Sequence, residues 1–411
     1  MRALPLAFAA LALAQAPAFA KTLDVAAGPN AQERLQGALI DAKAGDVVRL
    51  AAGRFDLADG LSLDVANVTV QGAGPARTVL AFDAQKGEGE GLLITSNGVT
   101  VRGLGIENAK GNGVKAKGVD QISFVDLRVE WTGGPKAANG PYGVYPVSAT
   151  NVLIDRVVVK GASDAGIYVG QSRNVVVENS RAEFNVAGIE IENCYNADVH
   201  DNVSTHNAGG ILVFDLPGLP QMGGHSTRVY RNSIVANDTP NFAAKGNIVA
   251  NVPTGTGVLI MANRDVHVFD NTIDGNGSAA VMLVSYRDAF DDDAYNPLPR
   301  DIAVRGNRIG RNGFAPAFPG GAELAKITGG SITPVFWDGV TRFKGPKGDL
   351  QGGDARLAIL DGPVVNLRLK TQGAPLMAAD PAVTPTLSTA TLTAPAPVVL
   401  PAAQRRLESH P

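Results

Sequence analysis

The stretch from residue 166 to residue 213 holds three copies of one short pattern: Gly166-Ile167-Tyr168-Val169, Gly188-Ile189-Glu190-Ile191 and Gly210-Ile211-Leu212-Val213. Each copy starts 22 residues after the previous one, at positions 166, 188 and 210. The same pair of a small and an apolar residue recurs on both sides, at Gly113-Val114, Gly143-Val144, Gly257-Val258 and Ala280-Val281. A repeat of this length is typical of stacked units, each of which covers the apolar face of the next.

The repeat is built from strands. Apolar residues alternate at period two, as in Ile167/Val169 and Ile189/Ile191, and Val and Ile dominate. Neither helical spacing nor the regularly spaced Leu of a leucine-rich repeat is found. Short strands with Asn and Gly at the corners predict an all-β fold, a single-stranded right-handed parallel β-helix of about ten coils.

An asparagine recurs once per coil in a second pattern, Val-x-x-Asn. Asn tolerates the left-handed backbone conformation of a corner, and its amide can bond to the Asn one coil above. We therefore expect an asparagine ladder along one edge of the solenoid. Its members are Asn179, Asn202, Asn232, Asn271 and Asn307.

Residues 1–20 have the features of a secretory signal peptide. Arg2 precedes an apolar run at residues 3–13, and Ala18-Phe19-Ala20 stands before Lys21 as a cleavage site. This run is too short to span a bilayer, and no later segment reaches the roughly 18 apolar residues that a span needs. We expect a periplasmic or secreted protein without a membrane span.

The segment that follows, residues 21–59, is expected to hold a capping helix and the first strands. Leu35, Leu39 and Ile40 fall on one helical face, with Asn30 as the candidate N-cap. Such a helix would cover the open first coil, whose free strand edges would otherwise invite polymerisation.

We expect the β-helix to occupy residues 60–375, ending in irregular strands near residues 334–339 and 364–369. Residues 376–411 are rich in Pro, Ala and Thr with few large apolar residues, which predicts a disordered tail. The net charge of −3 gives no basic footprint for nucleic acid. The single Cys194 cannot form an internal disulfide and is interpreted as a buried free thiol.

Insertions in the repeat indicate which face is used. Extra residues precede the Gly-Ile strand at 132–141 and 239–256, and follow it at 216–224 and 286–299. The outward face of this strand should therefore be the floor of a trough walled by loops, where function usually resides.

Alternation identifies two outward columns on this floor. The first half is aromatic and acidic, and the second half is apolar and expected to lie under loops or the C-terminal segment. One column is Tyr145, Tyr168, Glu190, Leu212, Leu259 and Met282. The other is Val147, Gly170, Glu192, Phe214, Met261 and Val284.

Glu190 and Glu192 are the most informative pair. Two carboxylates two residues apart on one strand share a face at roughly 6 to 7 Å. They could serve a metal or act as general acid and base with Asp164 and Asp215 on adjoining coils. Tyr145 and Tyr168 would be platforms for a sugar ring. The alternative is a solvated strand face whose charges serve solubility.

Other candidates lie near the loops: His225, Lys245 and Arg264. A polysaccharide lyase needs a cation to neutralise the uronate carboxylate, a role that Lys245 or Arg264 could fill, although loop salt bridges explain them equally. No His or Cys spacing indicates a zinc or copper site. The acidic run at residues 288–293 reads as a solvated loop, with calcium as the minority interpretation.

The loop at residues 214–221 (FDLPGLPQ) and the run at 240–264 resemble an uncharacterised family of exported bacterial parallel β-helix proteins. The resemblance covers most of residues 22–340 and implies the fold. More distantly the chain resembles the pectate-lyase-like superfamily, whose members are mostly lyases, hydrolases and epimerases of acidic polysaccharides. The Asp-Pro-His-Asp motif of mannuronan epimerases and the multi-Asp signature of polygalacturonases are not found, so no catalytic residue is carried over.

Two functions follow as hypotheses. One is an exported protein that binds an extracellular polysaccharide, expected to be acidic, and as an enzyme cleaves or modifies it in the trough. The other is a non-catalytic periplasmic scaffold that docks a partner protein on the apolar half of the same face. Uncovered Leu212, Phe214 and Met261 would favour the scaffold. Glu190, Glu192 and a loop cation converging on one cavity would favour the enzyme.

Overall fold

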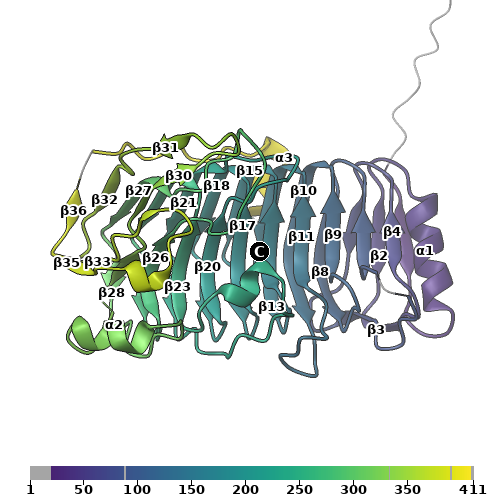
Figure 1. Ribbon diagram of the computed structural model, residues 1–411. Coiled ribbons are helices and arrows are strands. Elements are labelled where there is room, and N and C mark those ends of the chain that lie inside the picture. Colours follow the sequence, from purple (N-terminus) through teal and green to yellow (C-terminus); the bar gives the residue numbers. More distant parts are fainter. Residues whose placement is uncertain (1–19, 88, 333, 389–390, 409–411) are drawn as a thin grey trace, which may run out of the picture.

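The structure is a computed structural model that describes residues 20–87, 89–332, 334–388 and 391–408. Except for Ala20, the predicted signal peptide lies outside these residues. The fold is a right-handed parallel β-helix, as predicted, and its about 13 turns exceed the expected ten. Figure 1 shows the coils stacked side by side from α1 (Ala31–Asp41) to the C-terminal strands.

One long sheet carries the Gly-Ile strands of the repeat. It has 12 strands, all parallel to their neighbours except the last. They are β4 (Leu61–Leu63), β7 (Leu92–Ile94), β9 (Val114–Lys117), β11 (Tyr142–Val147), β14 (Ala165–Gly170), β17 (Ala187–Glu192), β20 (Gly209–Phe214), β23 (Thr256–Met261), β26 (Ala279–Val284), β29 (Val335–Trp337), β33 (Val364–Asn366) and β35 (Ala382–Thr384).

A second sheet of 21 strands forms the rest of the wall. It consists of β1 (Thr22–Val25), β2 (Val47–Leu50), β3 (Gly53–Asp56), β5 (Thr69–Gln71), β6 (Thr78–Ala81), β8 (Thr100–Glu107), β10 (Asp120–Glu130), β12 (Thr150–Asp155), β13 (Val158–Lys160), β15 (Arg173–Glu178), β16 (Arg181–Glu183), β18 (Tyr195–His200), β19 (Val203–Thr205), β21 (His225–Tyr230), β22 (Ser233–Val235), β24 (Arg264–Phe269), β25 (Thr272–Asp274), β27 (Arg300–Arg305), β28 (Arg308–Ile309), β32 (Leu357–Ile359) and β36 (Leu387–Ser388).

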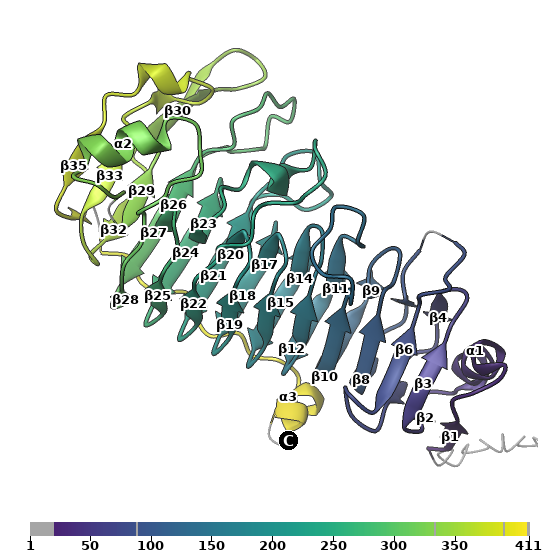
Figure 2. The same ribbon diagram turned by 90° about the horizontal axis from the view of Figure 1, so that it is seen from below.

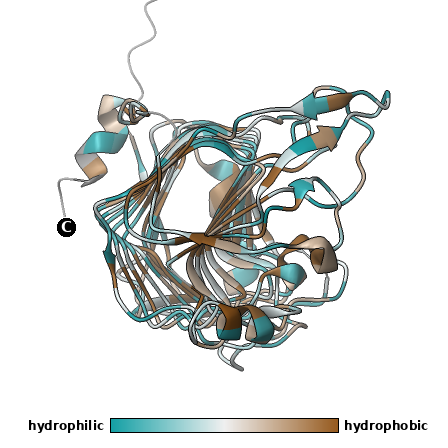
Figure 3. Cartoon of the chain, turned by 60° about the vertical axis from the view of Figure 1, so that its left-hand side comes forward, coloured by the Kyte–Doolittle hydropathy of each residue, from teal (hydrophilic) through white to brown (hydrophobic). Residues whose placement is uncertain are grey.

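The remaining elements lie at the C-terminal end and in the loops. They are the three-stranded sheet of β30 (Val340–Lys344), β31 (Leu350–Gly352) and β34 (Lys370–Thr371), the short helices η1 (Ile248–Asn251), α2 (Gly321–Ile327) and η2 (Leu376–Ala378), and α3 (Ala402–Glu408). Figure 3 looks nearly along the solenoid and shows the longer loops gathered on one side of the stacked coils.

The predicted interior column is confirmed. Ile167, Ile189, Ile211, Val258 and Val281 pair with one another in that order across β14, β17, β20, β23 and β26. All five side chains are fully buried in the main hydrophobic core. Stacking similar β-branched side chains at the strand spacing gives a continuous apolar core.

The glycine before each interior Ile also faces inward. A Cβ at Gly166 would lie 2.7 Å from the Asn185 amide, and one at Gly188 would lie 2.3 Å from Ser204 Oγ. Only glycine fits such a close approach without movement of its neighbours. Two successive residues therefore face the interior, and strict alternation starts only after them.

An asparagine ladder runs through four of the five predicted residues. Asn202, Asn232, Asn271 and Asn307 are joined by amide hydrogen bonds of 3.0, 2.9 and 2.8 Å. The placement of Asn179 in this ladder is wrong, because Ser180 takes that position and donates its backbone N–H to Asn202. The left-handed conformation belongs to the preceding residue in each coil, which includes Asn179. The ladder asparagines themselves have ordinary backbone angles.

A second ladder was not predicted. It runs through Asn185, Asn207, Asn237, Asn276 and Asn312, with amide hydrogen bonds of 3.0 Å at each step. Each ladder amide also donates to a backbone carbonyl, so these buried groups are satisfied. The two ladders fix the register between coils at two corners.

The N-terminal cap has the expected position with two differences. Leu35 and Leu39 of α1 are buried against the first coil, whereas Ile40 is 67% exposed. Ile40 therefore does not belong to the packed face. Asn30 is the N-cap residue, but it takes a left-handed conformation and makes no side-chain capping bond.

The prediction of a disordered tail is wrong for the described residues beyond 376. The chain forms η2, β35 and β36, and residues 391–408 then run back along the outside of the 21-stranded sheet to α3 beside β10 (Figures 1 and 2). Leu400 is buried against Val125, Leu153 and Val176, which form an apolar strip on that outer face. The composition of the tail indicated disorder because composition alone does not reveal that an apolar strip elsewhere in the chain binds Leu400.

We predict that Asn207→Ala destabilises the protein by about 1–3 kcal/mol, because the buried groups that the removed amide bonds in Asn185, Asn237 and Ala182 would each lose that partner. Thermal or urea unfolding of the two proteins measures the difference. Asn251→Ala, at an exposed asparagine of η1, is the matched control and should change stability little. Equal losses in both variants would contradict a role for the ladder.

Candidate functional site

The outward face of the 12-stranded sheet has the predicted register. Tyr168, Glu190, Leu212, Leu259 and Met282 pair in sequence, and so do Gly170, Glu192, Phe214, Met261 and Val284. The chemistry of this face therefore changes along the solenoid axis from aromatic and acidic to apolar.

The apolar half of the face is largely covered, as expected. Leu212 and Phe214 are 0% and 1% exposed and belong to a second hydrophobic cluster outside the solenoid. Val249 and Val252 of the loop around η1 and Phe336 near the C-terminal end pack in the same cluster. An uncovered Leu212 and Phe214 would have favoured a docking scaffold, but both side chains are covered. Met261 is half-buried.

The other half brings three tyrosines and three carboxyl groups together. We call these the tyrosine–carboxylate site: Tyr142, Tyr145, Asp164, Tyr168, Glu190 and Glu192. The rings of Tyr142, Tyr145 and Tyr168 contact one another with centroids 4.4 to 4.9 Å apart. Tyr142 and Tyr145 are half-buried, so part of each ring faces solvent. The tyrosines form an aromatic platform at the edge of the carboxyl groups.

Tyr168 links the platform to the acids. Its hydroxyl donates a 2.6 Å hydrogen bond to Glu192 Oε1. The ring lies over Gly170, where an added Cβ would be 2.5 Å from ring atoms. Gly170 therefore leaves the space that this ring orientation needs. Tyr142 donates a longer bond of 3.4 Å to Asp164 Oδ2.

The carboxyl groups are buried, which differs from the solvated outward face that alternation alone suggests. Glu190 is 2% exposed and its Oε2 has no hydrogen-bond partner, whereas Asp164 and Glu192 are 7% and 8% exposed. The side chains do point away from the solenoid core, but neighbouring side chains of the outer cluster cover them. Asp164 and Glu192 are the two carboxyl groups with some access to solvent.

Burial controls the charge of the site. It raises the pKa of Asp164 to about 7, with a further contribution from the charge of Glu192. It also raises the pKa of Glu192 to about 7, against the hydrogen bond from Tyr168, which favours the ionised form. The pKa of Glu190 lies well above its usual range because of burial and the nearby Asp164. Near neutral pH the site therefore holds both protonated and ionised carboxyl groups.

The edge of the platform carries a small polar network. Lys115 Nζ lies 4.9 Å from the centre of the Tyr145 ring and 3.0 Å from Glu90 Oε1. Asn112 donates to the same Glu90 oxygen and accepts from the backbone N–H of Tyr142. Donors and acceptors thus surround the exposed part of the rings.

Tyr142 was missed by the sequence analysis for a structural reason. Strict alternation from the outward Tyr145 would make Val144 and Tyr142 inward and Gly143 outward. In the structure, Gly143 and Val144 both face the interior. The alternation breaks at this glycine, so Tyr142 faces outward like Ala165 and Ala187 in the next coils. The close approach of the glycine column was the signal that could have revealed it.

Asp215 serves the wall loop. It accepts hydrogen bonds from the backbone N–H groups of Gly223 and Gly224, at 3.0 and 2.9 Å, and so closes the loop at 216–224. Burial raises its pKa to about 6, and its charge contributes to the raised pKa of Glu192. Asp215 therefore lies beside the tyrosine–carboxylate site and stabilises the wall loop.

The predicted basic residues do not join the site. His225 and Arg264 pair with each other on β21 and β24, in the other sheet, and His225 stacks on Tyr195 at 4.5 Å. Burial and the charge of Arg264 lower the pKa of His225. Lys245 is exposed on the loop before η1. The charge of Arg264 acts on Asp215 of the wall loop, and none of the three residues is among the groups that shift the pKa values of Glu190 and Glu192.

Metal and membrane features were searched in the described ranges. Within them, no group of three or more His, Cys, Asp or Glu side chains is arranged to hold a metal ion, and calcium stays a prediction. Asp293 of the acidic loop is paired with Lys347. None of the helices in the described part of the chain combines the length and apolar character that a bilayer span requires. Cys194 is buried and free, and burial raises its pKa to about 12.

Comparison with protein families gives one match. Residues 90–237 match the model of a right-handed beta helix region. This stretch includes β11, β14 and β17, which carry the tyrosine–carboxylate site together with Asp164 just before β14. A comparison with curated proteins gave no match.

Three solved structures are among those similar to this chain. An alginate lyase from Paenibacillus sp. str. FPU-7 is 17% identical, with 71% of this chain and 97% of that chain covered and a TM-score of 0.44. The A-module of the mannuronan C-5 epimerase AlgE6 of Azotobacter vinelandii is 16% identical, with 77% and 89% covered and a TM-score of 0.48. The catalytic domain of a GH87 alpha-1,3-glucanase is 11% identical, with 74% and 68% covered and a TM-score of 0.37.

We predict that the stability of the protein falls as the pH rises. The carboxyl groups of Glu192 and Asp164 have pKa values of about 7 in the folded protein and about 4 when unfolded, so the folded state binds more protons between these values. The free energy of unfolding should therefore decrease from pH 5 to pH 8. Glu192→Gln should weaken this dependence and stabilise the protein at pH 8 by about 1–3 kcal/mol.

Thermal unfolding over this pH range measures both effects. Glu323→Gln, at an exposed position of α2, is the control and should follow the wild type. A Glu192→Gln protein that is less stable than the wild type at pH 8 would show that the carboxylate is stabilising in its ionised form.

Proposed function

We propose that this protein binds a neutral glycan at the tyrosine–carboxylate site and hydrolyses a glycosidic bond there. One observation carries the proposal: two carboxyl groups with pKa values of about 7 lie beside half-buried tyrosine rings. A sugar ring offers an apolar C–H face to an aromatic ring and hydroxyl groups to polar neighbours. The exposed parts of Tyr142 and Tyr145, with Lys115, Glu90 and Asn112 at their edge, present that combination.

The acid and base roles follow from the hydrogen bonds. The Tyr168 hydroxyl favours the ionised form of Glu192, which suits a base that activates water or a carboxylate that attacks the anomeric carbon. The charge of Glu192 in turn keeps a proton on Asp164, which suits an acid that protonates the leaving oxygen. Glu190, with 2% exposure, is out of reach of substrate and would remain protonated beneath the pair.

The charges favour a neutral glycan over the acidic polysaccharide expected from the sequence. Three carboxyl groups line the site, and Lys115 at the edge of the tyrosine platform is already paired with Glu90. A uronate would need a cation to neutralise its carboxylate before elimination or epimerisation. Arg264 and Lys245, the residues proposed for that role, lie elsewhere. Acid–base hydrolysis needs only the two carboxyl groups.

Export is part of this proposal. The signal peptide expected at residues 1–20 would place the protein in the periplasm or outside the cell, where polysaccharides of walls and capsules are found. Intact-mass analysis of the secreted or periplasmic protein would show whether the mature chain begins at Lys21.

A glycan array followed by a degradation screen tests the proposal. We expect neutral glycans to bind, Tyr145→Ala to weaken binding at least tenfold, and Glu192→Gln to retain binding but lose about 10²-fold or more in turnover. Tyr195→Ala removes a half-buried tyrosine from the other sheet and is the matched control.

Two results would overturn the assignment. Glu192→Gln could turn over the glycan at the wild-type rate, which would remove the base from the mechanism. The protein could instead convert alginate or polygalacturonate to unsaturated products, which would establish a lyase with its site elsewhere.

A further inference from the structure

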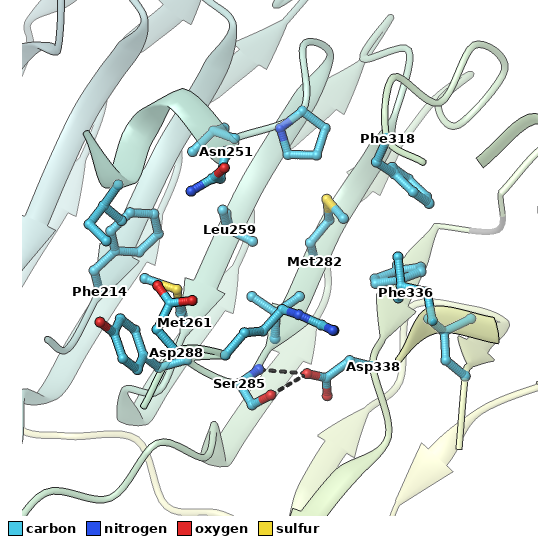
Figure 4. A pocket seen from close by; sticks show the side chains of 18 of the residues that line it. Phe214, Asn251, Leu259, Met261, Met282, Ser285, Asp288, Phe318, Phe336 and Asp338 are labelled. Carbon is cyan, nitrogen blue, oxygen red and sulfur yellow. Dashed lines mark hydrogen bonds between the residues drawn. The ribbon is translucent and has the colours of Figure 1, made fainter. Parts of the chain in front are cut away.

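A cavity of about 400 Å³ lies over the C-terminal half of the same sheet face (Figure 4). Its floor is formed by Leu259 and Met261 of β23 and by Met282 and Val284 of β26. Segments distant in sequence build the walls: η1 and the residues after it, Pro319 and its neighbour Phe318, and Phe336 of β29. The volume is in the range of small-molecule sites in proteins.

The lining is apolar in the interior of the cavity. The flexible side chains of Met261 and Met282 lie between the aromatic rings of Phe214 and Phe336 (Figure 4). Methionine adapts its shape to irregular apolar ligands, unlike the β-branched residues that form the solenoid core. Met261 and Val284 remain half-buried although their neighbours are covered.

The buried polar side chains of the cavity, Ser285 and Asp338, are already bonded, whereas Asn251 lies at an exposed position of the wall. Asp338 Oδ2 accepts from the backbone N–H and the hydroxyl of Ser285, at 2.7 and 2.8 Å, and Oδ1 accepts from the backbone N–H of Val340. These groups therefore have little left to offer a polar ligand. The other charged lining residues, Arg287 and Asp288, are exposed at the rim.

We propose that this cavity binds the hydrocarbon chain of an amphiphile, with the head group at the rim formed by Tyr286, Arg287 and Asp288. The buried polar groups of the interior, Ser285 and Asp338, are already bonded, so a sugar or a nucleotide would lose water from its hydroxyl and amide groups there without compensation. A methylene chain loses no hydrogen bonds and gains the contacts of the methionine and aromatic side chains. This site is independent of the glycan site, from which the buried Leu212 and Phe214 separate it.

Calorimetric titration of the full-length mature protein with n-alkyl carboxylates, from octanoate to palmitate and below their micelle concentrations, tests the proposal. We expect one chain per protein, with affinity rising about fourfold per methylene group and levelling off when the chain outgrows the cavity. Affinity that does not depend on chain length would overturn it. Alkyl maltosides form the second arm: if they bind as well, the chain alone is recognised, and if only carboxylates bind, the rim also selects an anionic head.

Two variants place the binding in this cavity. Val284→Trp fills it, and Ile248→Asp puts a charge in its wall; each should weaken binding of the longest chain at least tenfold. Val203→Trp, at a half-buried valine of the other sheet, is the matched control and should bind like the wild type. Wild-type affinity in both Val284→Trp and Ile248→Asp would overturn the assignment, and Ile248→Asp keeps the test valid if Val284→Trp unfolds.

The result is separable from the test of the glycan site. Glu192→Gln should bind alkyl chains like the wild type, because its change lies beyond Phe214. Loss of chain binding in that variant would show that the two sites are one and would overturn the independence claimed here.

Discussion

The hydrogen bond from one buried asparagine amide to the next, repeated at two corners of the solenoid, is the constraint on which the structure depends. A primary amide in the core must be paired, and here its partner is the same group one coil away. A slip of one residue between two of these coils would break the bond of each ladder at that step. The coils between Asn185 and Asn312 are therefore held in one register, which the outer face of the 12-stranded sheet shares.

The outer face converts this register into a gradient of chemistry. Equivalent positions carry Tyr168, Glu190, Leu212, Leu259 and Met282, so aromatic, acidic and apolar surfaces follow one another at the spacing of the coils. The loops then determine how much of each surface is exposed to solvent. Covering the acids raises their pKa values to the neutral range, which turns ordinary glutamates into groups able to exchange protons at physiological pH.

Most of the fold was predictable because its signals are local. The Gly-Ile pairs predicted the interior column and the two outward columns in their correct register, and α1 lies where Leu35 and Leu39 predicted the capping helix. The errors came from packing that strict alternation within one repeat does not describe. Tyr142 was missed because the glycine column interrupts alternation, the burial of Glu190 depends on side chains packed over it, and residues 391–408 pack on a strip formed by Val125, Leu153 and Val176 far earlier in the chain.

The returning C-terminal segment has a consequence for the order of folding. Consecutive coils join residues about one repeat apart, so each can add to the one before with little loss of chain entropy. Gln404 instead bonds to the carbonyl of Ile122, 282 residues away, and Val398 bonds to Asp198, 200 residues away. These contacts can form only after the intervening coils are in place. A segment that docks last contributes little to the folding transition state. Its contacts therefore chiefly slow unfolding and increase the kinetic stability of the folded solenoid.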